Sequence, residues 1–265
     1  MFNNQVVWIT GASSGIGEAL ALNMAARNAK LVLSARRQGE LERVKAACVA
    51  AGAAPENVLV LPLDVTDSDR LTPATDTVLA TFGQIDLLIN NAGLSQRSLC
   101  KDTDMSVYRQ LMEVDVLGQI ALTKAVLPHM LKRRQGHLAV TASVAGKIGV
   151  SQRTGYCAAK HAVMGFFDAL RSEVENEGLR VSTITPGFIR TDIARNALSA
   201  DGTPFGEEDK DIAGGMDVTE CAQVIVSGLA KGKPEIAVGK GKEMHALWLK
   251  RLSPALVFRM VRGRG

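Results

Sequence analysis

The sequence predicts an α/β fold in which a doubly wound, seven-stranded parallel sheet is covered by helices on both faces. Short apolar runs rich in Val, Leu and Ile alternate with longer stretches of helical periodicity from residue 5 to residue 239. A glycine-rich turn directly follows the first apolar run. No low-complexity linker interrupts the alternation. The 265 residues are therefore expected to form a single domain.

The apolar runs locate the strands, and the periodic stretches between them locate the helices. Seven strands are expected at QVVWIT (5–10), KLVLSA (30–35), NVLVLPLD (57–64), IDLLIN (85–90), GHLAVTA (136–142), RVSTIT (180–185) and PEIAVG (234–239). Six helices are expected near 15–28, 38–52, 67–82, 104–132, 154–177 and 217–230. Since crossovers between parallel strands are right-handed, these helices should cover both faces of the sheet.

Two segments lie outside this alternation. Residues 186–216 form a long polar insertion with Pro and Gly at its edges, at the carboxyl end of the sixth strand, where such loops usually act as active-site lids. Residues 241–265 form a basic amphipathic tail, in which Pro254 should kink or restart the helix. We therefore divide the chain into a nucleotide-binding domain at 1–240, which includes the lid, and the tail.

Composition and charge exclude several classes of protein. Hydrophobic residues make up 46% of the chain and charged residues 22%, so the chain can build a core and is not disordered. The net charge of +4 is concentrated in the tail and does not form a nucleic-acid-binding face. No signal peptide and no membrane-spanning stretch are expected. The scattered cysteines and histidines favour a reduced, metal-free cytoplasmic protein.

The turn after the first strand, TGASSGIG, is typical of a phosphate-binding loop. Glycine permits a positive φ and a close approach of phosphate to the backbone, and free N–H groups at the following helix start attract a pyrophosphate. The candidate cofactor contacts here are Gly11, Ser13, Ser14, Gly15, Ile16 and Gly17. The alternative is a glycine-rich strand–helix turn that binds no ligand.

The end of the second strand indicates which dinucleotide would bind. An Asp or Glu at this place accepts a hydrogen bond from the ribose 2′-hydroxyl of NAD. Here the chain has Arg36 and Arg37, whose guanidinium groups would bind the 2′-phosphate of NADP(H). The alternative is a pair of solvated arginines at a helix start, where the helix dipole disfavours cations. We expect NADP(H).

Tyr156 and Lys160 are four residues apart and should meet on one face of a helix. A nearby ammonium group stabilises tyrosinate and makes the phenol a better acid at neutral pH. This spacing also occurs by chance, and a lysine that extends along a helix surface is the alternative interpretation.

Together these motifs resemble the short-chain dehydrogenase/reductase family, in its single-domain, Rossmann-type form of roughly 250 residues. The resemblance rests on ordered motifs, each at a strand end: TGASSGIG (10–17), LDV (63–65), NNAG (90–93), TASVAG (141–146), YCAAK (156–160) and PGFIRT (186–191). It extends over nearly the whole chain, to about residue 240.

The resemblance implies roles for individual residues. Ser143, Tyr156 and Lys160 match the catalytic residues of the family: Tyr156 as general acid or base, Lys160 as its charged neighbour and ribose ligand, and Ser143 as donor to the substrate oxygen. The implied cofactor contacts beyond the glycine loop and the arginines are Asp64, Val65, Asn90, Asn91, Ala92, Gly93, Pro186, Gly187 and Thr191.

One position departs from the family pattern. The family has Asn where this chain has Asp115, and that Asn is held to fix a helix distortion and a water that relays protons to the lysine. A carboxylate at this place could pair with Lys160 through water, or could be protonated if desolvated. Asp115 is therefore a further candidate catalytic residue.

The leading hypothesis is an NADPH-dependent carbonyl reductase or alcohol dehydrogenase. The residues after Ser143, up to Arg153, and the 186–216 lid should shape a mostly apolar pocket with little fixed charge, which favours a lipophilic carbonyl or alcohol substrate. The alternative is a nucleotide-binding sensor or scaffold without turnover. We expect a homodimer or homotetramer. The tail either packs on the domain or a sister subunit, or lies on a membrane surface as an interfacial helix.

Overall fold

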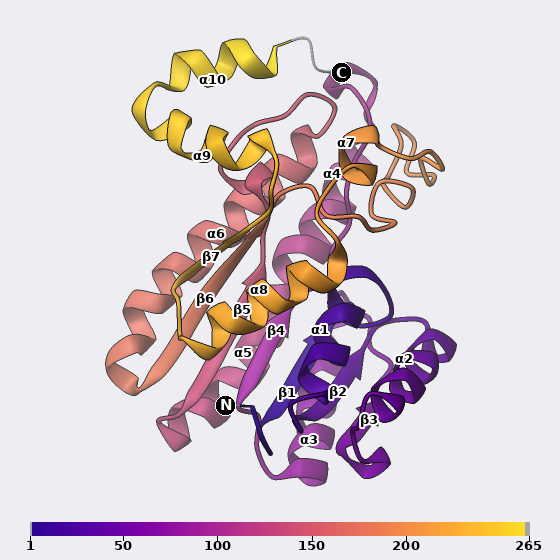
Figure 1. Cartoon of the computed structure of the whole chain (residues 1–265), viewed down its shortest axis with the longest axis vertical. Helices are drawn as coiled ribbons and strands as arrows, with labels where there is room; N and C mark the ends of the chain where they lie inside the picture. The colour runs from indigo at the N-terminus through magenta and orange to yellow at the C-terminus, as the bar shows by residue number, and fades with distance from the viewer. Residues whose placement is uncertain (1, 263–265) are drawn as a thin grey trace.

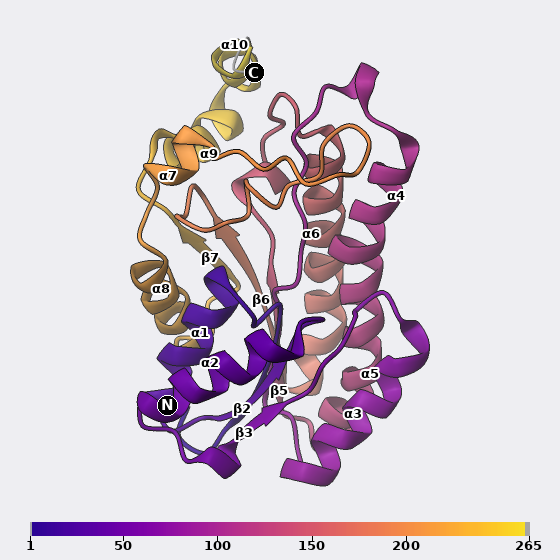
Figure 2. The ribbon, with the colours of Figure 1, turned by 90° about the vertical axis from the view of Figure 1, so that its right-hand side faces the viewer.

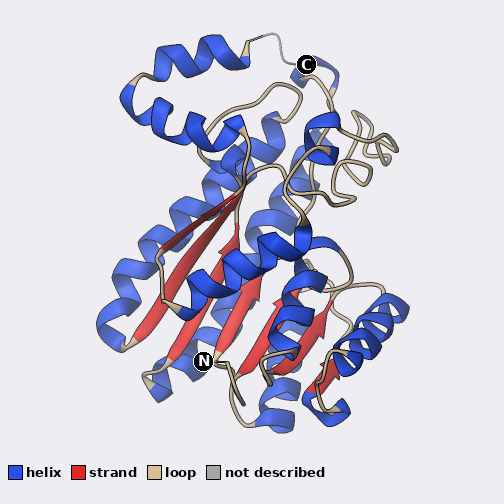
Figure 3. Ribbon diagram, viewed as in Figure 1, coloured by secondary structure: helices blue, strands red, loops and turns tan. Residues whose placement is uncertain are grey.

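The computed structural model describes residues 2–262, and it contains one seven-stranded parallel sheet of order β3-β2-β1-β4-β5-β6-β7. The strands are β1 (Val6–Thr10), β2 (Lys30–Ser34), β3 (Val58–Val60), β4 (Leu87–Asn90), β5 (Gly136–Thr141), β6 (Leu179–Pro186) and β7 (Glu235–Val238). Figure 3 shows this sheet between two layers of helices. The predicted fold class, a doubly wound parallel sheet in one domain, is confirmed.

Helices cover both faces of the sheet, as Figures 1 and 2 show. One face carries α1 (Gly15–Ala25), α2 (Gln38–Ala50) and α8 (Val218–Ala230), and the other carries α3 (Ser68–Phe82), α5 (Gly118–Arg133) and α6 (Thr154–Val174). Side chains of β1 alternate between the two cores: Ile9 packs into the first and Trp8 into the second, and both are fully buried. The remaining short helical turns are η1 (Pro55–Asn57), η2 (Cys100–Asp102), η4 (Val144–Gly146) and η5 (Glu175–Glu177).

The helix expected over 104–132 is interrupted. It consists of α4 (Met105–Met112), a π-helical turn η3 (Glu113–Leu117) and α5. Single π-helical turns within α-helices occur frequently at functional sites. This turn contains the buried Asp115, so the distortion that the family resemblance implied is present with an acid at that position.

The insertion and the tail lie beyond the carboxyl ends of the strands (Figure 1). The 186–216 insertion is irregular apart from α7 (Lys210–Ala213), whose N-terminal N–H groups donate to the Asp209 carboxylate. The tail forms α9 (Lys242–Leu252) and α10 (Pro254–Val261), so the helix restarts at Pro254 as expected. Within residues 2–262, no helix is long and apolar enough to cross a membrane.

The order of the strands determines where a ligand can bind. β1 lies between β2 and β4, so the chain winds in opposite directions on the two sides of β1. Ligands of open parallel sheets bind in the crevice at the carboxyl ends of the strands at such a switch point.

Candidate active site

A cleft of about 890 Å³ lies at the switch point. It is lined by every cofactor-binding and catalytic residue that the sequence singled out, apart from Gly17, Asp115 and Asn90. Gly17 and Asp115 lie directly behind its wall, whereas Asn90 is fully buried and donates its side-chain N–H to Thr123 Oγ1 at 3.0 Å. The expectation that Asn90 lines the cleft is therefore wrong, because the β4 side chain at this position faces the helix layer and its neighbour Asn91 faces the cleft.

The glycine loop requires glycine for two different reasons. Gly11 has a φ of +64°, a conformation that residues with a Cβ rarely adopt. A Cβ on Gly17 would collide with the carbonyl oxygen of Gly11 and approach the Asn91 amide within 2.7 Å. The loop therefore packs tightly against the β4 end, and the start of α1 at Gly15 opens onto the cleft.

The Thr10 side chain ties the ends of β1 and β4 together. Its hydroxyl accepts hydrogen bonds from the backbone N–H groups of Asn91 and Ala92, each at 3.0 Å. The Asn91 side chain donates back to Thr10 O at 3.1 Å. These bonds hold Asn91, Ala92 and the glycine loop in one rigid wall of the cleft.

Three arginines surround the end of β2. Arg36 and Arg37 are exposed and line the cleft, and Arg37 Nη2 donates to Ser13 Oγ at 3.3 Å. Sequence reasoning missed Arg43, which binds Glu18 at 2.7 Å and reaches the backbone oxygen of Ser13 at 3.4 Å. Arg43 lies within α2, more than one turn after Arg37, and no sequence pattern near it indicates a contact with the glycine loop.

Tyr156 lies in the first turn of α6, which a buried glutamine fixes in place. Gln96, in the loop after β4, is fully buried, and its Oε1 accepts from Gly155 N at 2.7 Å and from Tyr156 N at 3.4 Å. The residue before the helix, Arg153, provides no side-chain cap of its own. Gln96 therefore satisfies N–H groups that a helix start leaves without partners. No local sequence pattern indicates this contact between residues 59 positions apart.

Lys160 lies one turn after Tyr156 in α6, and its ammonium group approaches the Tyr156 ring. Its Nζ is 5.7 Å from the centre of the Tyr156 ring and donates to Thr141 O at 3.1 Å. The lysine is nearly fully buried, so it is not an exposed lysine on a helix surface, which was the alternative interpretation. Ser143 completes the group: it precedes η4, lines the same cleft, and its Oγ accepts from Ala145 N at 3.1 Å.

Asp115 contacts Lys160 directly. Its Oδ2 is 3.3 Å from Lys160 Nζ, and its Oδ1 accepts from Leu94 N at 2.7 Å. Oδ2 accepts no well-aligned hydrogen bond from any residue between 2 and 262, so the contact is mainly electrostatic. Gly93 makes room for it, since a Cβ there would lie 3.2 Å from Oδ1 and 3.3 Å from Nζ. The separation leaves no space for a water between the two charges.

Burial and pairing shift the pKa values of this pair. Complete burial raises the pKa of Asp115 above its usual value, although the Lys160 charge and the Leu94 N–H oppose the shift. Burial also acts to lower the pKa of Lys160, but Asp115 and Tyr156 outweigh it, so the pKa of the ammonium is raised. Lys160 is therefore held in its charged form by the acid beside it.

The cleft carries more charge than the sequence led us to expect. Arg153 lines it and binds Asp209 at 2.7 Å, and Arg97 binds the same carboxylate at 3.1 Å. This network connects the lid to the loop before α6. Glu113, Asp192 and Glu243 also line the cleft. The apolar residues that line the cleft include Leu94, Val144, Val150, Phe188, Ile193, Leu198, Pro204 and Ile212.

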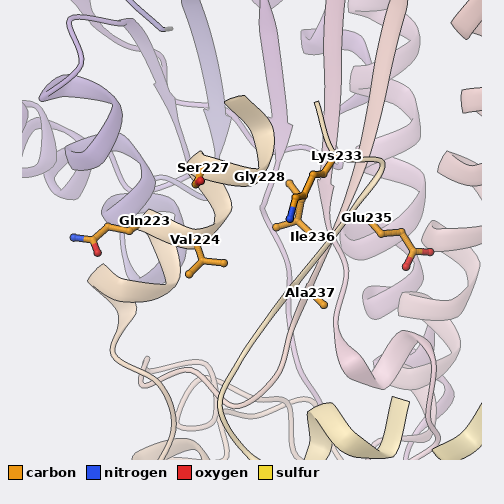
Figure 4. Close-up of a pocket in the computed structure, with 8 residues that line it drawn as sticks. All are labelled: Gln223, Val224, Ser227, Gly228, Lys233, Glu235, Ile236 and Ala237. Carbon is orange, nitrogen blue, oxygen red and sulfur yellow. The ribbon is translucent and has the colours of Figure 1, made fainter. Parts of the chain in front are cut away.

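A second, smaller hollow of about 310 Å³ lies between α8 and the edge strand β7 (Figure 4). Gln223, Val224, Ser227 and Gly228 line it from α8, and Lys233, Glu235, Ile236 and Ala237 from β7 and the loop before it. It shares no lining residue with the large cleft, and none of the residues that the sequence singled out lies there.

Comparisons with known proteins identify relatives of this chain. The family model for short chain dehydrogenases matches residues 5–202. The chain is 44% identical over 253 residues to Dehydrogenase/reductase SDR family member 7 of Homo sapiens, covering 95% of this chain and 75% of that protein. It is 41% identical over 262 residues to Dehydrogenase/reductase SDR family protein 7-like of Drosophila melanogaster, covering 97% of this chain and 80% of that protein.

The chain belongs to the short-chain dehydrogenase/reductase family of oxidoreductases. Among solved structures, it superposes on a family member from Burkholderia phymatum in complex with NAD, with a TM-score of 0.85, 26% identity and coverage of 96% and 95%. A metagenomic family member in complex with NADP is 31% identical, with a TM-score of 0.66 and coverage of 70% and 83%. Family members with this fold thus bind either nicotinamide dinucleotide.

Proposed function

We propose that this protein is an NADP(H)-dependent oxidoreductase that interconverts a carbonyl and an alcohol, with Tyr156 as general acid and base. The observation that carries the proposal is that Ser143, Tyr156 and Lys160 line the same cleft as the glycine loop. A phenol beside a buried, charged lysine can exchange a proton near neutral pH, and a dinucleotide bound to the glycine loop would lie in the same cleft.

The residues of the cleft fit a nicotinamide dinucleotide. Gly11 and Gly17 form a cradle in which a Cβ would be strained or would collide, and the start of α1 opens onto it. Thr141 Oγ1 also lines the cleft, is buried, and has no hydrogen-bond partner among residues 2–262. The glycine loop and Asn91 would hold the dinucleotide, Asp64 and Val65 its adenine end, and Gly187 and Thr191 its nicotinamide end. When bound, the cofactor supplies or accepts a hydride.

Side chains of this protein carry out the proton transfer and stabilise the developing charge. In carbonyl reduction, Tyr156 donates its phenolic proton to the substrate oxygen, and in alcohol oxidation it accepts that proton. Ser143 donates a hydrogen bond to the same oxygen and stabilises its developing charge. Lys160, kept charged by Asp115, stabilises the tyrosinate that remains.

The preference for NADP(H) over NAD(H) rests on the end of β2. Arg36 and Arg37 line the cleft there, and the chain has no acid at this place to accept a ribose hydroxyl. Two guanidinium groups provide charge-assisted hydrogen bonds to a 2′-phosphate. Glu18 does not neutralise the charges of Arg36 and Arg37, because it forms an ion pair with Arg43.

The apolar residues of the lining support a lipophilic carbonyl or alcohol as substrate. The four cysteines are free, which supports a reducing, cytoplasmic compartment. We also propose that the protein is a homodimer or homotetramer, since β7 is an edge strand that pairs only with β6, and open edges favour association.

One observation favours a second candidate function, a nucleotide sensor without turnover. The direct contact between Asp115 and Lys160 replaces the water relay that the family resemblance implies. If that relay is essential, the protein would bind the dinucleotide and reduce nothing.

The deciding experiment is a panel of aldehydes and ketones of increasing chain length, assayed by oxidation of NADPH and, in parallel, of NADH. We expect turnover with NADPH that rises with the apolar surface of the substrate. Tyr156→Phe should abolish turnover while the dissociation constant of NADPH changes only a few-fold, because the phenol acts in the transition state. NADPH binding without turnover of any carbonyl would favour the sensor, and a preference for NADH would refute the cofactor assignment.

A further inference from the structure

Exposed apolar surface is concentrated on the C-terminal hairpin, which we define as α9 and α10, residues 242–261. Ten large apolar side chains are exposed among residues 2–262, and half of them lie in this segment: Trp248, Leu252, Leu256, Phe258 and Met260. Trp248 is 71% exposed and Leu252 is 85% exposed. Figure 1 shows the hairpin at one end of the molecule, beyond the carboxyl ends of the strands. Such clustering on a soluble domain marks an interaction surface.

Packing on the domain accounts for other side chains of the hairpin. Val257 is fully buried in a cluster with Val144 and Ile148. Lys250 Nζ donates to Lys147 O, and Glu243 Oε1 accepts from Phe188 N at 3.2 Å. The hairpin is therefore attached to the body by one set of residues, and it presents a different set to solvent.

The charge of the hairpin indicates what it binds. Residues 242–262 contain five basic side chains, Lys242, Lys250, Arg251, Arg259 and Arg262, and a single acid, Glu243. None of these basic side chains forms an ion pair within residues 2–262. Large apolar side chains interspersed with unpaired Lys and Arg are typical of helices that lie in the interface of an anionic bilayer. A second copy of the chain would instead bring an equally basic surface against this one, and like charges repel across a symmetric contact.

We propose that the C-terminal hairpin is a membrane-docking surface that lies in the interface of a bilayer containing anionic lipids. Trp248, Leu252 and Phe258 enter the headgroup region, and the exposed basic side chains of Lys242, Arg251 and Arg259 bind lipid phosphates.

The position of the hairpin connects this surface to the cleft. Glu243 of α9 lines the cleft, and Val144 both lines the cleft and packs against the hairpin. A docked protein therefore holds its cleft next to the bilayer. If the proposed function with a lipophilic substrate holds, the substrate can enter from the membrane without crossing water; the docking itself does not depend on that function.

Tryptophan fluorescence tests the proposal on the intact chain. The two tryptophans differ sharply, because Trp8 is fully buried in the core and Trp248 is exposed. Vesicles of phosphatidylglycerol and phosphatidylcholine should shift the emission to the blue, and brominated lipids should quench it. Pure phosphatidylcholine vesicles should bind more weakly, and salt should weaken binding to the anionic vesicles.

Paired variants separate the two contributions, and co-sedimentation with vesicles measures them. Arg251→Gln with Arg259→Gln should weaken binding by roughly twentyfold or more, since each basic residue near an anionic surface contributes about fivefold. Leu252→Gln with Phe258→Gln should weaken it at least about tenfold on both kinds of vesicle. Met105→Gln is the matched control, because Met105 is 60% exposed on α4 but outside the hairpin, and this variant should bind as the wild type does.

The same measurements can overturn the proposal. Emission that does not change with vesicles but shifts to the blue as protein concentration rises would show that a second copy covers the hairpin. Equal loss of binding in the Met105→Gln variant would show non-specific adsorption. Turnover of a water-soluble carbonyl is measured in parallel, so that loss of catalysis is distinguished from loss of docking.

Discussion

Replacing Asp115 with Asn changes the charge beside Lys160 and very little else. The Asn side chain keeps an oxygen that can accept from Leu94 N, as Asp115 Oδ1 does now at 2.7 Å. In place of Oδ2, 3.3 Å from Lys160 Nζ, it presents an amide. The ammonium group then loses its negative partner and keeps only the hydrogen bond to Thr141 O.

The expected size of the effect follows from two distances. Asp115 Oδ2 lies 3.3 Å from Lys160 Nζ, which lies 5.7 Å from the centre of the Tyr156 ring, so the carboxylate is within about 9 Å of that ring. At an effective dielectric constant of about 20, two unit charges at that separation interact by about 2 kcal/mol, or somewhat over one pKa unit. A negative charge at this place disfavours tyrosinate, so its removal favours ionisation of the phenol. We expect the pH profile to shift toward acid by about one unit or more.

The assay is kcat/KM against pH, from about pH 5 to pH 10, for wild type and Asp115→Asn with one carbonyl substrate and NADPH. Because burial raises the pKa of Asp115, a change of its charge during turnover would add an inflection to the wild-type profile, and Asn would remove it. Asp86→Asn is the control: Asp86 is also buried and pairs with Arg133 at 2.8 Å, but it lies before β4, at the opposite end of the strand from the cleft. That variant should lose stability without moving the profile.

Two results would refute the electrostatic reasoning. In one, Asp115→Asn loses activity a hundredfold with an unmoved profile, so that the carboxylate acts through something other than its charge on Lys160 and Tyr156. In the other, the profile shifts toward alkali. That result would mean that Lys160 loses its proton in the variant and no longer stabilises tyrosinate.

Three further predictions concern other parts of the molecule. Arg36→Asp should raise the KM for NADPH roughly ten- to a hundredfold and that for NADH far less, since one charge-assisted phosphate contact is lost; equal effects on both would refute the assignment. Gln96→Leu should lower both Tm and kcat, because it leaves Gly155 N unsatisfied at about 1–3 kcal/mol and removes the Nε2 donor to Ser98 Oγ; an unchanged Tm would refute this. Burial lowers the pKa of His137 to about 4, so the unfolded chain takes up a proton first and stability falls as pH drops from about 6.5 to 4. Urea unfolding should lose about 2 kcal/mol more between pH 7 and pH 5 in wild type than in His137→Gln.

The strands were predictable because each is an apolar run bounded by turn residues. The largest discrepancy is the third strand, expected over 57–64 and observed over Val58–Val60. Leu61 N and Leu63 N still donate to the carbonyl groups of residues 33 and 35, so the chain continues alongside β2. It then turns at Asp64, whose carboxylate accepts from Thr66 N. The apolar periodicity of 104–132 did not reveal the π-helical turn, since a single extra residue in a helical turn scarcely changes it, and only the family resemblance implied a distortion there.

The candidate site was predictable where chemistry and strand ends coincide. The glycine loop, Arg36 and Ser143 all follow a strand directly, and parallel strands bring their carboxyl ends together. Gln96, Arg43 and Glu243 were not predictable, because each acts on a segment far away in sequence and leaves no local pattern.

The pairing of Asp115 with Lys160 was predictable in part from the sequence and in part only from the structure. The sequence identified an acid where the family has an amide, and it left open whether that acid would pair with Lys160 through water or be protonated. The structure decides for direct contact, because the π-helical turn directs the carboxylate inward and Gly93, with no side chain, leaves the space that both groups need. A methyl group at residue 93 would lie within 3.3 Å of both charged groups. The glycine of NNAG therefore has a role beyond the proposed cofactor contact: a side chain there would crowd the ion pair that keeps the lysine charged beside the proposed acid.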